Sequence, residues 1–254
     1  MVPDLWSNEG GQSAAGKLID HIVQCHPASS QLKELSESRN QHIYECLNNL
    51  LNEKARSLKL TSCEVLTKDL HVWPDFHGNR SPIADSSLCG AICGLTLDSG
   101  LNDLAKLYLA TLQALASGSL HILDRLEKYG HKITTVFMCG GLSKNPLFVQ
   151  VHSNVLKRPV VLGKEKETVL LGGAILGALA AKDFPSFQSA MGHMCKIGEV
   201  VNTNKDLDDF YSKKTSSVFN NAEESNGIQG HYGIIRIVQS TNSSFYLIFV
   251  CKCY

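Results

Sequence analysis

The fold is decided by residues 133–145, which read ITTVFMCGGLSKN. The run from Ile133 to Cys139 is rich in β-forming residues and predicts a strand, which Gly140 and Gly141 end. A diglycine between a strand and a helix lets a ligand approach backbone amides, and the helix start adds partial positive charge. A tight turn that needs positive φ accounts for the same glycines equally well. Both interpretations stay open from the residues alone.

Helical and strand patterns alternate on both sides of this segment. The expected elements are a long helix capped by Ser99 or Asn102 and stopped by Gly130, a short helix over 148–156, a strand over 159–162 and a small-residue helix over 168–181. This order implies crossover connections with helices that cover a sheet, so the predicted fold class is α/β. Gly173 and Gly177 in the last helix are expected to pack closely against that sheet, since the apolar run is too short for a membrane span.

The two ends of the chain differ from this central part. Amphipathic helices are expected over 14–25 and about 43–58, then short strands and a turn-rich loop up to residue 94. A further helix is expected over 205–219. We assign no domain to 220–254, and expect its apolar run Phe245–Cys251 to be unpaired and, with an open sheet edge, to promote aggregation.

Composition excludes several classes of function. The chain of 254 residues has 24 Lys+Arg and 24 Asp+Glu, and this zero net charge argues against nucleic acid or an anionic membrane as partner. Its 43% hydrophobic and 19% charged residues exclude a disordered chain. Nine cysteines, an odd number, favour a reducing, cytoplasmic location.

Four residues could be drawn as a zinc site: His71, His77, Cys89 and Cys93. Their spacing is looser than the paired CxxC of zinc sites, and small buried thiols are the simpler interpretation. We therefore expect no metal site.

Four motifs occur in an order that resembles one family. They are EGGQSAAG (9–16), DFHGNRSP (75–82) with GAICGL (90–95), FMCGGLSKNPLFVQVHSNVLKRPVV (137–161) and ETVLLGGAILGALAA (167–181). Together they resemble the FGGY-type carbohydrate kinases, nearest to the ribulokinase-like branch, over about residues 2 to 219. The resemblance implies the C-terminal lobe of an actin/hexokinase-like, ribonuclease-H-like ATPase fold, incomplete at its N-terminus. The expected domains are this lobe over 1–219 and a divergent, irregular tail over 220–254.

The same resemblance implies a nucleotide site. Position by position, it carries nucleotide contacts onto Gly16, Asp20, Gly140, Gly141 and Asn145. The implied ligands are ATP with Mg²⁺ and a small-molecule sugar. In physical terms, bare glycine backbone suits close approach to a nucleotide, and an Asn side chain can both donate and accept.

The chain also departs from the family pattern. The catalytic Asp, the first phosphate-binding hairpin and a second Gly-Thr segment are expected to precede Met1, so no catalytic residue is assigned. One hypothesis is a kinase that phosphorylates a pentulose, D-ribulose being preferred, in a full-length parent. The other is a catalytically inactive isoform that at most binds nucleotide or a partner. We expect both ends to arise from alternative processing of a longer transcript.

Overall fold

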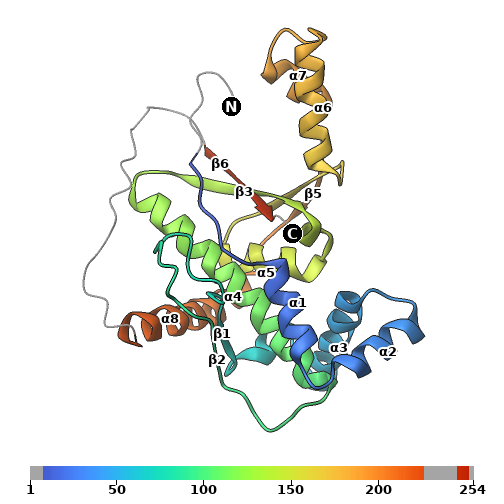
Figure 1. Ribbon diagram of the computed structural model, residues 1–254, viewed down its shortest axis with the longest axis vertical. Coiled ribbons are helices and arrows are strands. Elements are labelled where there is room, and N and C mark those ends of the chain that lie inside the picture. Colours follow the sequence, from blue (N-terminus) through green and yellow to red (C-terminus); the bar gives the residue numbers. More distant parts are fainter. Residues whose placement is uncertain (1–7, 226–244, 252–254) are drawn as a thin grey trace.

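A computed structural model describes residues 8–225 and 245–251. Its helices are α1 (Gly16–Cys25), α2 (Ser29–Arg39), α3 (Ile43–Ser57), α4 (Leu101–Lys128), α5 (Pro146–Leu156), α6 (Thr168–Ala180), α7 (Phe187–Met194) and α8 (Asp208–Ser225), with 3₁₀ turns η1 (Cys63–Thr67), η2 (Gly141–Lys144) and η3 (Lys205–Leu207). Its strands are β1 (His71–Trp73), β2 (Ala91–Cys93), β3 (Ile133–Gly140), β4 (Val160–Gly163), β5 (Ile197–Val201) and β6 (Phe245–Cys251). Figure 1 shows α4 crossing the middle of the molecule, with the larger sheet on one side and α1–α3 on the other.

The long helix α4 organises the core. It ends where predicted, because Gly130 follows it with φ of 89°. Its start was predicted wrongly: the N-cap is Gly100, without a side-chain cap, and Asp98 Oδ1 instead accepts from the Gly100 N–H at 3.1 Å. Apolar side chains from its neighbours pack around it: Ile19 of α1, Leu47 of α3, Phe148 of α5 and Val136 of β3.

The larger sheet has the order β5-β4-β3-β6. Strands β3 and β4 are parallel and joined through α5, which confirms the predicted crossover. Strand β6 also runs parallel to β3, in a register that pairs Gly140 with Cys251. The expectation that Phe245–Cys251 is unpaired is therefore wrong: its backbone meets the hydrogen-bonding groups along one side of β3.

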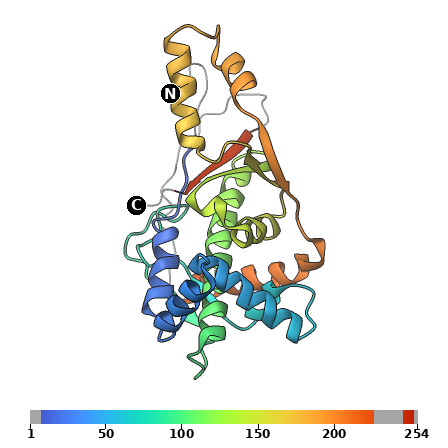
Figure 2. The same ribbon diagram turned by 90° about the vertical axis from the view of Figure 1, so that its right-hand side faces the viewer.

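Helix α6 corrects a third expectation. It does not pack closely against the sheet: Leu170 is 72% exposed and Leu176 59%, and a Cβ added at Gly173 or Gly177 would meet nothing within 4 Å. Only Ile175 of this helix is buried. Figures 1 and 2 show α6 and α7 projecting together from the rest of the fold. The physical reason is that an apolar helix is buried only where another element meets it, and α7 is its main neighbour among the described residues.

Helix α8 confirms the helix expected over 205–219, and it continues through residues 220–225 of the tail. It is held by buried polar groups. Lys214 Nζ donates to the carbonyls of Thr67 (2.5 Å) and Leu70 (2.8 Å), and burial lowers the pKa of Lys214 to about 8. The Tyr211 hydroxyl donates to the buried Glu64 carboxylate. The remainder of the tail, 226–244 and 252–254, lies outside the described residues.

No helix in the described ranges is both long and apolar enough to cross a membrane.

Candidate functional site

The site begins at the diglycine turn, where β3 ends. Gly140 has φ of 91° and ψ of −176°, a conformation essentially confined to glycine, so its identity has a structural cause. Ser143 Oγ donates to the Gly140 carbonyl at 2.7 Å and tightens the turn. Gly141 lies outside the left-handed region and is exposed, so its backbone conformation does not demand glycine. The tight turn that needs positive φ therefore explains Gly140, whereas Gly141 leaves bare backbone open to a ligand.

Asn145 connects this turn to α5. It is the N-cap of the helix, and its Oδ1 accepts from the Leu147 N–H at 3.2 Å. Pro146 follows at the first helical position, where its missing N–H costs nothing. The turn and the positive end of α5 thus lie together at the carboxyl end of β3, where open α/β sheets bind ligands.

Two further side chains surround Asn145. Its Nδ2 donates to the Tyr108 hydroxyl at 2.6 Å, and its Oδ1 accepts from Asn48 Nδ2 at 3.0 Å. The Tyr108 hydroxyl in turn donates to Asn48 Oδ1 at 3.2 Å. Asn145 is 6% exposed and Tyr108 is fully buried. The N-cap of α5 is therefore joined to α3 and α4.

Asp20 reaches the same group through Tyr44. The Tyr44 hydroxyl donates to Asp20 Oδ1 at 2.5 Å, and its ring stacks on that of Tyr108 with centroids 5.6 Å apart. Gly16 begins the same helix, α1, one turn before Asp20, and is buried. Of the five residues expected to contact nucleotide, Gly140, Gly141 and Asn145 belong to one turn. Asp20 is linked to Asn145 through Tyr44 and Tyr108, and Gly16 lies on the helix that carries Asp20.

Three residues of this group were not predicted as functional: Tyr44, Asn48 and Tyr108. Tyr44 and Asn48 fall in the amphipathic helix expected over about 43–58, and nothing local marked any of the three as functional. One signal was present, since Tyr44 and Asn48 are four residues apart and therefore share a face of α3. Their distance from Asn145 along the chain kept the connection hidden.

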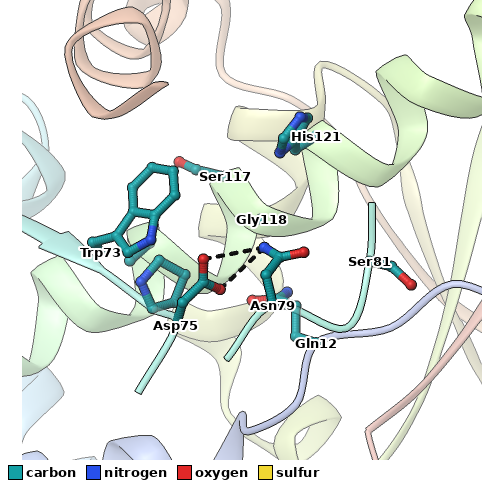
Figure 3. Close-up of a pocket in the computed structure, with 10 residues that line it drawn as sticks. Gln12, Trp73, Asp75, Asn79, Ser81, Ser117, Gly118 and His121 are labelled. Atoms are coloured by element: carbon teal, nitrogen blue, oxygen red, sulfur yellow. Dashed lines mark hydrogen bonds between the residues drawn. The ribbon is translucent and has the colours of Figure 1, made fainter. Parts of the chain in front are cut away.

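Two of the quoted motifs meet at a pocket beside α4 (Figure 3). Its lining includes Gln12, Trp73, Asp75 and His121, and its empty space is about 330 Å³, part of it open to solvent. Asn79 Nδ2 donates to both oxygens of Asp75 at 3.1 Å, and burial raises the pKa of that carboxyl.

Contacts also join the segments that carry these motifs. Ser13 Oγ donates to the Gly78 carbonyl at 2.9 Å, and Arg80 pairs with Glu9. Gln12 Nε2 donates to the Leu115 carbonyl at 2.7 Å, while its buried Oε1 has no partner among the described residues. The glycine-rich segment and the turn-rich loop therefore form one surface next to α4.

A metal site was not expected. Strand pairing places His71 opposite Cys93. Within 8–225 and 245–251, however, no three His, Cys, Asp or Glu side chains are grouped so that they could hold a metal ion.

Comparison with known sequences identifies one family. Residues 1–181 match the model described as the C-terminal domain of the FGGY family of carbohydrate kinases. An FGGY carbohydrate kinase domain-containing protein from Xenopus laevis is 54% identical over 84% of this chain and 38% of its own length. A D-ribulokinase from Saccharomyces cerevisiae is 35% identical over 72% of this chain and 26% of its own. The chain thus spans less than two-fifths of the length of these curated relatives.

Solved structures agree on the fold. A xylulose kinase from Lactobacillus acidophilus superposes with a TM-score of 0.62 at 19% identity, covering 83% of this chain and 38% of that one. A glycerol kinase from Plasmodium falciparum, solved with ADP, gives 0.55 at 25% identity over 80% and 37%. The predicted α/β class is confirmed, and the fold matches that of sugar kinases over part of their length.

Proposed function

The chain belongs to the FGGY family of carbohydrate kinases, and from that premise we propose that the diglycine turn, Asn145 and α1 form the nucleotide side of a kinase active site. The observation that carries this proposal is the linkage of Asp20 to Asn145 through Tyr44 and Tyr108. Asp20 and Asn145, far apart in the sequence and each expected to contact nucleotide, are thus linked through two tyrosines. Asn145 follows the exposed Gly141 by four residues.

The side chains present suit the neutral and anionic parts of ATP. Glycine backbone and the N-terminus of α5 favour phosphate or ribose oxygens, and an amide side chain suits polar atoms of a base or sugar. The carboxylate in the group, Asp20, already accepts from Tyr44. This donor set fits a Mg²⁺ ion held chiefly by the phosphates of the nucleotide, where it would neutralise charge during phosphoryl transfer. The chain itself would bind and orient the nucleotide.

We propose a pentulose as the sugar substrate of the full-length parent, with D-ribulose first. Support comes from the relatives named D-ribulokinase and ribulokinase. The group around Asn145 contains no base assigned to activate a sugar hydroxyl. A lobe that forms one side of a cleft neither positions the sugar nor excludes water from it. We therefore propose that the isolated chain binds nucleotide without phosphorylating sugar, and that 1–219 is its kinase lobe.

Asn145→Asp tests the nucleotide site. A carboxylate still caps α5 and still accepts from Asn48, and the Tyr108 hydroxyl, which accepts from Asn145 in the native chain, can turn to donate to it. The thermal midpoint should therefore stay close to that of the native chain. The substitution removes the amide N–H and adds a negative charge, so affinity for ADP measured by calorimetry should fall at least roughly tenfold. Asn49→Asp makes the same chemical change on α3, where Asn49 donates to Gln41 and not to Asn145 or Tyr108, and should leave affinity unchanged.

Two results would decide against the proposal. The first is no ADP or ATP binding by the native chain even at millimolar concentration, which would remove the nucleotide site. The second is release of ADP from ATP and Mg²⁺ in a coupled assay with pentuloses. Turnover that Asn145→Ala abolishes would show that the isolated chain is an active kinase.

A further inference from the structure

We infer that Asn48 and Tyr108 are positioning residues: with Asn145 they close a ring of three hydrogen bonds that fixes the Asn145 amide and leaves it one N–H for a ligand. This inference rests on the proposed nucleotide site and adds to it two residues and a rule for what the ligand must present.

The ring runs in one direction. Asn145 donates to Tyr108, Tyr108 donates to Asn48, and Asn48 donates back to Asn145, over 2.6, 3.2 and 3.0 Å. Because every member both donates and accepts, each bond polarises the next. The three side chains come from the N-cap of α5, from α4 and from α3, so the ring also holds these helices at a common point.

The helix cap determines the orientation of the Asn145 amide. Its Oδ1 accepts from the Leu147 N–H as well as from Asn48. Turning the amide over would set Nδ2 against the Leu147 N–H, so two donors would face each other. The orientation is therefore imposed by the backbone of α5, and the direction of the ring follows from it.

Counting donors and acceptors shows what a ligand can meet. Both lone pairs of Asn145 Oδ1 are used, by Asn48 and by Leu147. One N–H of Nδ2 is directed to Tyr108, and the other has no partner among the described residues. Toward a ligand, Asn145 can thus donate one hydrogen bond and cannot accept one. The ligand atom that faces it must be a hydrogen-bond acceptor, such as a purine ring nitrogen or a ribose oxygen.

Burial keeps the ring in this state. Tyr108 is fully buried, and burial raises the pKa of its hydroxyl far above the ordinary range, so the hydroxyl keeps its proton. Tyr44 covers the Tyr108 ring and donates to Asp20, which ties α1 to the same point. A side chain held in this way does not have to be ordered when a ligand binds.

The test combines binding with a direct view of the amide. In Tyr108→Phe and in Asn48→Ala, ADP affinity measured by calorimetry should fall roughly threefold to tenfold, the range for loss of one hydrogen bond. The double variant should cost no more than the larger single change, because either substitution opens the ring. In NMR spectra, one of the two Asn145 amide protons should be protected from exchange, and Tyr108→Phe should remove that protection.

Tyr211→Phe is the matched control. It removes another buried tyrosine hydroxyl, which contacts Glu64 and Gln113, and so lowers stability without opening the ring. ADP affinity should be unchanged. Native affinity in Tyr108→Phe, or an unprotected Asn145 amide in the native chain, overturns the inference. Absence of ADP binding by the native chain refutes the proposed function instead, and amide protection then still decides whether the ring holds Asn145.

Discussion

Gly140 and Gly141 should respond differently to the same substitution. Gly140 has φ of 91° and ψ of −176°. An alanine forced into that region costs about 1–3 kcal/mol of backbone strain. For a chain of this size each kcal/mol lowers the melting temperature by about 2–4 °C. Gly140→Ala should therefore melt roughly 2–12 °C below the native chain, as followed by circular dichroism.

Gly141→Ala supplies the contrast at the next residue. Gly141 lies outside the left-handed region and is exposed, so its substitution should change stability by no more than about 0.5 kcal/mol. The added methyl group would nevertheless block close approach of a ligand to the backbone, and ADP affinity by calorimetry should fall by about tenfold or more. A Gly140→Ala chain as stable as the native one would refute the strain argument. Native affinity in Gly141→Ala would refute the assignment of this backbone to the nucleotide.

Other features make further predictions. Burial lowers the pKa of His152 to about 4, so between pH 7 and pH 5 the unfolded chain takes up a proton that the folded chain excludes. The free energy of unfolding, measured in urea, should fall by about 2 kcal/mol from pH 7 to pH 5, and His152→Gln should remove that loss. Burial raises the pKa of Glu64, so its contribution to the free energy of unfolding is present below the unfolded pKa and is lost as pH rises through the folded pKa. The stability of Glu64→Gln should therefore fall less with rising pH, and an equal slope of stability against pH in both chains would contradict this. We expect the exposed apolar surface of α6 to cause self-association, which Leu170→Lys with Leu176→Lys should reduce in size-exclusion chromatography; monomeric elution of the native chain would disprove it.

Local pattern was sufficient wherever neighbours in the sequence make the structure. The strand before Gly140, the crossover through α5 and the stop of α4 at Gly130 were all predicted, because side-chain periodicity and glycine act within a few residues. Helix α2 was missed because Leu32 is its single buried residue, so its apolar pattern is weak. The cap of α4 was misplaced because Asp98 acts on the turn before the helix.

Long-range packing decided the rest. Phe245–Cys251 was interpreted as an unpaired apolar run, since its pairing with β3 joins segments more than 100 residues apart. The apolar composition of α6 predicted burial, yet a helix is buried only where another layer meets it, and α7 covers little of it.

The sequence by itself determined the α/β class, the diglycine turn and the motifs that mark an FGGY-type kinase lobe, because each is written in residues close together in the chain. Only the tertiary structure decided how Asn145 is used. Its partners Asn48 and Tyr108 are 97 and 37 residues away, and no local pattern reports a hydrogen bond across that separation. Packing α3, α4 and α5 around one point converts an asparagine able to donate and accept into one that only donates.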